Sequence, residues 1–125
     1  MKIKKIDAYE LLDSRGTPTI AARVQLDNEI EEFGFVPSGA STGSKEAVEK
    51  RDGGKSFNGK GVKGVIDDAD KNLFPQFLGM DVRDQLSIDR KIIELDGTQN
   101  KAKFGANVTL ALSLAVCKAA ASAEN

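Results

Sequence analysis

The spacing of apolar residues changes once along this chain, and that change limits the folds open to it. Before residue 36 the spacing is two residues, which is typical of a strand with one buried face (Ile20, Ala22, Val24 and Leu26). After residue 62 the spacing is three or four residues, as on one face of a helix (Val62, Val65, Ile66, Ala69, Leu73 and Phe77). Because strands come first and helices follow, the sequence predicts an α+β domain.

We expect the strands to form a three-stranded antiparallel meander within residues 1–36. A first strand lies within residues 3–12, and the turn signal of residues 13–18 ends it. The alternating segment 20–26 is the second strand. After the tight turn at Asp27-Asn28, residues 29–36 are expected to return as the third strand.

About four helices are expected after the meander, centred near residues 47, 68, 89 and 114. Pro75 should end or kink the second helix, since proline lacks the backbone donor and its ring clashes with the preceding turn. The third helix is expected from Asp81, as N-cap, to about Leu95, with four side chains facing inward: Leu86, Ile88, Ile92 and Ile93. Asp96-Gly97 should stop it. The last helix, Ala106 to Ala121, is so rich in Ala, Leu and Val that it should be largely buried.

Length and charge favour one ordinary globular domain. The 125 residues are 40% hydrophobic and 30% charged, with a net charge of −1, which gives no basic footprint for nucleic acid. No apolar run is long enough for a membrane span on our reading, because the run 110–121 is short and rich in Ala. The single cysteine, Cys117, cannot form an internal disulfide, which fits a reducing cytoplasm. Because Cys117 lies in the apolar run 110–121, we expect it to be a buried core thiol.

One loop stands out as the candidate binding site. Residues 37–43 read Pro-Ser-Gly-Ala-Ser-Thr-Gly, so two glycines provide backbone freedom and three hydroxyl groups offer oxygen ligands and hydrogen-bond donors. A short helix predicted at residues 44–50 would turn free N–H groups toward an anion at this loop. The same composition is also that of an ordinary linker, since these residues are common turn formers.

Other candidate sites fail on spacing. The Gly-Lys pairs within residues 51–61 lack the glycine positions and the preceding strand of a phosphate-binding P-loop. Asp67, Asp68 and Asp70 are expected to face solvent, because the inner face of their helix is apolar. The chain has no histidine and no convergent acid pair, so no complete set of general acid, base and nucleophile can be assembled from its residues.

Five ordered stretches of the sequence resemble the N-terminal domain of the enolases, the phosphopyruvate hydratases. They cover essentially the whole chain: Leu-Asp-Ser-Arg-Gly-Thr-Pro-Thr at 12–19, Val-Pro-Ser-Gly-Ala-Ser-Thr-Gly at 36–43 with Glu46-Ala47 and Arg51-Asp52, Gly-Lys-Gly-Val at 59–62, Leu-Asp-Gly-Thr at 95–98, and Gly-Ala-Asn at 105–107 followed by Ser-Leu-Ala at 113–115. The resemblance implies an enolase N-terminal domain over residues 1–125, with the larger C-terminal catalytic barrel absent from them.

The resemblance also implies a role for the loop. Enolases dehydrate 2-phospho-D-glycerate to phosphoenolpyruvate in glycolysis with two Mg²⁺ ions, and the matching loop closes over the substrate. By this likeness the lid comprises Ser38, Gly39, Ala40, Ser41, Thr42 and Gly43, and Ser41 ligates the second magnesium. The base, the acid and the carboxylates of the first magnesium belong to the barrel of the family. We therefore expect the 125-residue chain alone to be inactive.

Two positions depart from the family pattern. Thr17 stands where most enolases have asparagine, and Ala21 replaces a frequent glutamate at the dimer interface, although the full-length protein is expected to be a homo-oligomer. Arg15, beside a tight turn, is expected to have a structural or interface role. Two other functions remain open: a non-catalytic enolase-like module that binds a partner, and a domain of another acid-sugar or muconate-processing member of the superfamily.

Overall fold

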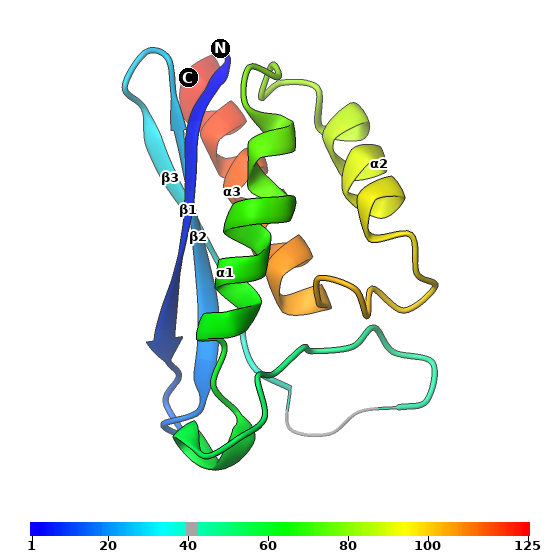
Figure 1. Ribbon diagram of the computed structural model, residues 1–125. Coiled ribbons are helices and arrows are strands. Elements are labelled where there is room, and N and C mark those ends of the chain that lie inside the picture. The colour runs from blue at the N-terminus through cyan, green and yellow to red at the C-terminus, as the bar shows by residue number, and fades with distance from the viewer. Residues whose placement is uncertain (40–42) are drawn as a thin grey trace.

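The computed structural model describes residues 1–39 and 43–125, and its first part is a three-stranded antiparallel sheet (Figure 1). Strand β1 spans Ile3–Leu12, β2 spans Pro18–Leu26 and β3 spans Glu31–Phe35, in the order β1-β2-β3. The register places Ala8, Ala22 and Gly34 side by side across the three strands. The predicted meander is therefore confirmed.

In the described part of the chain three α-helices follow, all on one side of the sheet (Figure 1): α1 at Lys63–Asn72, α2 at Gln85–Asp96 and α3 at Ala106–Glu124. Two short 3-10 turns, η1 at Ser56–Gly59 and η2 at Phe74–Phe77, flank α1. Helix α1 packs on β1, α3 packs across β2 and β3, and α2 packs on α3. Both chain termini lie at one end of the domain, and the described residues between β3 and α1 lie at the other end (Figure 1).

The core lies between the sheet and the two helices α1 and α3. Ile20, Val24 and Leu112 are fully buried in it. The closest approach is at Gly34, where a Cβ atom would lie 2.2 Å from the carbonyl oxygen of Ala111 on α3. Only a glycine leaves room for the helix backbone at that distance from the strand.

The predicted helix ends are partly confirmed. Helix α1 stops at Asn72, and Pro75 is the second residue of the 3-10 turn that follows, where its missing donor is tolerated. Gly97 ends α2 in the left-handed conformation (φ 67°), where glycine carries no steric penalty. The predicted N-cap was wrong: Asp84 caps α2 by accepting the N–H of Ser87, and the carboxylate of Asp81 binds the guanidinium of Arg83 instead. Helix α3 is three residues longer than predicted.

The helix expected at residues 44–50 is absent, and this is the main error in the fold prediction. The Val48 N–H donates to the carbonyl of Asn100 (2.8 Å), and the Val48 carbonyl accepts the N–H of Ala106 (2.7 Å). The amide of Asn107 binds both backbone groups of Lys50. Because these groups are paired with another part of the chain, they are not available for bonds within a helix, and tertiary contacts override the local preference.

Three burial predictions were also wrong. Leu86 and Ile93 of α2 are 61% and 53% exposed, because α2 packs mainly on α3, and the side that carries Ile88 and Ile92 is the buried one. Cys117 is exposed rather than buried, since it lies on the side of α3 turned away from the sheet, while Val116 and Ala119 face the core.

Helix α3 is the one helix in the described residues that is long and apolar enough to cross a membrane by composition, with a mean hydropathy of 1.4. Its side chains Val108, Leu112 and Val116 are fully buried against the rest of the domain. A core helix of a globular domain accounts for this composition.

Candidate functional site

The residues that lead into the candidate loop are held against the turn between β1 and β2. The hydroxyl of Thr19 donates to the carbonyl of Val36, and Nη2 of Arg15 donates to the carbonyl of Ser38 at 2.7 Å. Arg15 is itself bound by the carboxylate of Asp13 at 3.1 Å. It thus makes the fixed hydrogen bonds that were predicted for it.

Asp13 organises that turn. Its Oδ1 accepts the backbone N–H groups of Arg15 (2.8 Å) and Thr17 (2.9 Å). The hydrogen bond from Thr17, followed by the contacts with Arg15, holds the pKa of Asp13 below its usual value despite some desolvation. The carboxylate therefore stays ionised and keeps Arg15 in place.

Glu49 binds the start of the loop directly. Its Oε1 accepts the backbone N–H of Gly39 at 2.7 Å, and its Oε2 accepts from Nη2 of Arg51 at 3.1 Å. The hydroxyl of Ser38 lies 3.5 Å from the same Oε2. One carboxylate thus joins two consecutive loop residues to an arginine.

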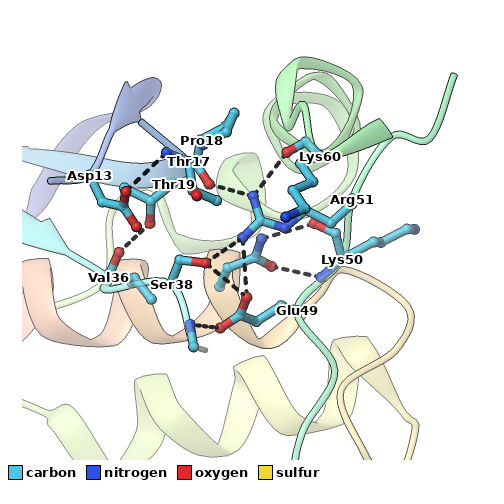
Figure 2. Close-up of polar contacts among 12 residues, drawn as sticks. Asp13, Thr17, Pro18, Thr19, Val36, Ser38, Glu49, Lys50, Arg51 and Lys60 are labelled. Carbon is cyan, nitrogen blue, oxygen red and sulfur yellow. Dashed lines mark hydrogen bonds and ion pairs between the residues drawn. The ribbon is translucent and has the colours of Figure 1, made fainter. Parts of the chain in front are cut away.

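Arg51 lies at the centre of this group of contacts (Figure 2). Its Nη2 donates to the hydroxyl of Ser38 at 2.9 Å, while its Nη1 donates to the carbonyl oxygens of Lys60 (2.9 Å) and Pro18. A planar guanidinium with several fixed donors is suited to join four partners in this way. We call Glu49, Arg51 and Arg15 the loop anchor.

The next residue, Asp52, connects the loop anchor to α1. Its two carboxylate oxygens accept the N–H groups of Gly64 and Val65, each at 3.0 Å. Glu10 of β1 accepts the N–H of Val62 at 2.9 Å. These carboxylates satisfy donors at the start of α1 that no residue of the helix itself caps. The N-terminus of α1 is therefore already paired with anionic groups of the chain.

An open hollow of about 500 Å³ lies beside the loop anchor. Its lining combines both charge signs with hydroxyl and amide groups: Arg15, Thr17, Ser38, Glu46, Arg51, Lys60 and Asn100 all contribute. Such a lining can bind polar groups by hydrogen bonds. Among the described residues it contains no base next to a nucleophile and thus no complete catalytic set.

The described residues hold no group of three or more Cys, Asp or Glu side chains that could bind a metal ion. Asp68, one of the three neighbouring aspartates on α1, accepts a hydrogen bond from Asn72 at 2.6 Å. Burial, with the charges of Asp7 and Asp67, raises the pKa of Asp70 above its usual value. These side chains behave as parts of a helix surface.

Of the six predicted loop residues, the structure describes Ser38, Gly39 and Gly43, and all three line the hollow. Ala40, Ser41 and Thr42 lie outside the described residues, and Ser41 is the predicted magnesium ligand. Sequence reasoning gave Glu49 no role and placed it in a helix. The signal that could have found it is the pairing of Glu49 with Arg51, two residues apart as on one side of an extended segment.

Comparison with known proteins agrees with the sequence resemblance. The family model described as "Enolase, N-terminal domain" matches residues 3–125. The enolase of Malacoplasma penetrans is 56% identical over 124 residues, which is 98% of this chain and 28% of the relative. Enolase 2 of Methanospirillum hungatei is 52% identical, over 99% of this chain and 29% of the relative. The enolase of Mycoplasmoides gallisepticum is 50% identical, over 100% and 26%. The chain spans less than a third of the length of these curated relatives.

Proposed function

Because this chain belongs to the enolase N-terminal domain family, we propose that it serves as that domain in a lyase that dehydrates 2-phospho-D-glycerate to phosphoenolpyruvate. The observation that carries the proposal is the family match from residue 3 to residue 125, together with the similarity to three enolases at 50–56% identity. The reaction is a step of glycolysis, and we propose a cytoplasmic enzyme.

Within that enzyme, residues 38–43 would form the lid over the substrate. Supporting this role, the described lid residues Ser38, Gly39 and Gly43 border an open polar hollow at one end of the domain. The lid would exclude water and complete the site when substrate binds. Ala40 and its neighbours would lie against the substrate.

Ser41 would supply one ligand to the second of two magnesium ions. A hydroxyl oxygen suits this hard cation, which binds few protein groups and keeps oxygen ligands from water and substrate. When bound, magnesium would offset the negative charge that develops on the substrate carboxylate as the neighbouring carbon loses its proton. Because the described residues contain no acidic cluster, the remaining ligands would have to come from outside them.

The base and the acid of the reaction would come from the C-terminal barrel of an enolase, which is the partner that this domain requires. The described residues offer lysines such as Lys45 and Lys60, and both are exposed. A solvated ammonium group at such a position is a poor base near neutral pH. We also propose that the full-length enzyme is a homo-oligomer.

A fusion tests the proposal. The 125-residue chain would replace the matching N-terminal residues of the Malacoplasma penetrans enolase, and phosphoenolpyruvate formation would be followed by its absorbance. We expect magnesium-dependent activity from the fusion. A fusion that folds and binds magnesium but forms no product, beside an active parent enolase, would contradict the proposed function.

A further inference from the structure

The two carboxylate oxygens of Glu49 bind different groups, one the loop backbone and the other an arginine. Oε1 accepts the Gly39 N–H at 2.7 Å, a short, charge-assisted hydrogen bond. Oε2 accepts from Arg51 at 3.1 Å and lies 3.5 Å from the Ser38 hydroxyl. Glu49 is therefore the residue through which the backbone of the loop is connected to the arginine.

Arg51 in turn is fixed to the body of the domain. Its Nη1 donates to carbonyl oxygens of Pro18, at the start of β2, and of Lys60, which precedes α1. The neighbouring Asp52 is bound to the first turn of α1. Residues 49–52 thus have partners on the sheet side and on the helix side.

The stem of the loop is held at successive positions. The carbonyl of Val36 accepts from Thr19, the carbonyl of Ser38 accepts from Arg15, and the N–H of Gly39 donates to Glu49. A displacement of Gly39 by even 1 Å would stretch its bond to Glu49 beyond hydrogen-bond range. These contacts therefore restrain the backbone at residue 39.

We propose that Glu49 is a positioning residue for the dehydration reaction, because it fixes the point from which the loop enters the site. This inference rests on the proposed function. Ser41 follows Gly39 by two residues, and two residues of chain span at most about 7 Å. Fixing Gly39 therefore limits the region that the Ser41 hydroxyl can reach and lowers the entropy cost of bringing it to the metal.

If Glu49 only stabilised the fold, its loss would change the melting temperature more than the position of the loop stem. The side chains of Glu49 and Arg51 are 27% and 19% exposed, so their ion pair is partly buried, and loss of the carboxylate should lower the melting temperature by a few degrees while Arg51 keeps its other partners. The contacts of Glu49 are with a loop stem rather than with the core. Loss of the carboxylate should consequently alter the position of residue 39 far more than it alters the melting temperature.

The test compares three variants by amide exchange, by enzyme kinetics and by melting temperature. Glu49→Ala removes both contacts. Glu49→Gln keeps an oxygen for the Gly39 N–H but brings N–H donors toward the guanidinium, so its effect should be intermediate. Glu94→Ala, at an exposed position on α2, is the matched control. Amide hydrogen exchange of Gly39 is measured in the 125-residue chain, and kcat, KM and magnesium dependence are measured in the fusion.

For Glu49→Ala we expect the Gly39 amide to exchange at least about tenfold faster, because a hydrogen bond to a charged group is lost. In the fusion, kcat at saturating substrate should fall about tenfold, and half-maximal rate should need more magnesium. The melting temperature should fall by less than about 8 °C, which leaves the chain folded. Glu94→Ala should match the parent in every readout.

Unchanged exchange at Gly39 in Glu49→Ala would overturn the proposal, and so would unchanged kcat and magnesium dependence in an otherwise active fusion. A loss of activity that merely follows a large drop in melting temperature would also contradict it. An inactive parent fusion would refute the proposed function itself, and the role of Glu49 in the reaction with it. The failure of one proposal is thereby distinguished from the failure of the other.

Discussion

Replacing Gly34 by alanine should destabilise the domain more than any other single methyl group added to the sheet. Gly34 lies on β3 where α3 crosses it, with the carbonyl oxygen of Ala111 2.2 Å and the backbone nitrogen of Ala115 2.6 Å from the position of a Cβ atom. Real Cβ atoms essentially never come within 3.0 Å of another heavy atom. Both obstacles are backbone atoms of a 19-residue helix, so no side chain can rotate away.

The magnitude follows from the movement required. The strand and α3 must separate by roughly 1 Å, which would also loosen buried contacts such as those of Ala115. Adding a methyl group to a close-packed interior costs about 1–3 kcal/mol, and we expect about 3 kcal/mol here. For a domain of this size, that lowers the melting temperature by about 10 °C.

Thermal and urea unfolding, followed by circular dichroism, would measure the effect. Gly61→Ala is the matched control, because an added Cβ there meets its nearest neighbours at 3.6–3.7 Å, an ordinary contact distance, with no positive φ angle. We expect it to shift the melting temperature by less than about 3 °C. If Gly34→Ala unfolded at the temperature of the parent, α3 could not lie on β3 as described.

Three further predictions concern the supports of the site and the isolated chain. Asp52→Ala should lower the free energy of unfolding by about 1.5 kcal/mol, because α1 loses its cap. Asp67→Ala, at an exposed position on α1, should change the free energy of unfolding by less than about 0.5 kcal/mol. Equal effects of the two substitutions in urea titrations would contradict the capping role. Burial tends to raise the pKa of Asp96, but the N–H of Phe104 and the hydroxyl and N–H of Thr98 outweigh it, so the pKa lies below its usual value of 3.8. The stabilisation from this ionised carboxylate should be present at pH 7 and lost as the pH falls below 3.8 through the lowered pKa. The difference in free energy of unfolding between the parent and Asp96→Asn should therefore become smaller in acid. A difference that does not depend on pH would refute this. The pure 125-residue chain should form no phosphoenolpyruvate, and magnesium-dependent product that scales with its concentration, after a control for contaminating host enolase, would overturn that expectation.

The fold was largely predictable because local patterns and tertiary packing agree over most of the chain. The alternation at Ile20, Ala22 and Val24 fixes which face of β2 is buried, and a slip of one residue would reverse it. Gly97 and Pro75 end helices through their own backbone chemistry, so the helix ends near them can be predicted from the neighbouring sequence alone. The match to the enolase N-terminal family is likewise visible in short motifs at 36–43 and 95–98.

The errors fall where distant residues decide the outcome. Residues 44–50 carry helix-forming side chains, yet Val48 and Lys50 bond to Asn100, Ala106 and Asn107, more than fifty residues away. The exposure of Cys117 and Leu86 depends on which sides of α3 and α2 receive a neighbour, and periodicity alone does not contain that information. The anchoring role of Glu49 was missed for the same reason, since its partners are set by tertiary structure.

Ser41→Ala in the fusion tests most directly the proposal that this domain delivers a magnesium ligand to an enolase site. A loop hydroxyl should contribute less than about 0.5 kcal/mol to folding, so the melting temperature should stay that of the parent fusion. Ser87→Ala, exposed on α2, is the control. Magnesium titration of the initial rate should show slower turnover for Ser41→Ala, with the largest deficit at low magnesium. Identical magnesium dependence for Ser41→Ala and the parent would contradict the claim.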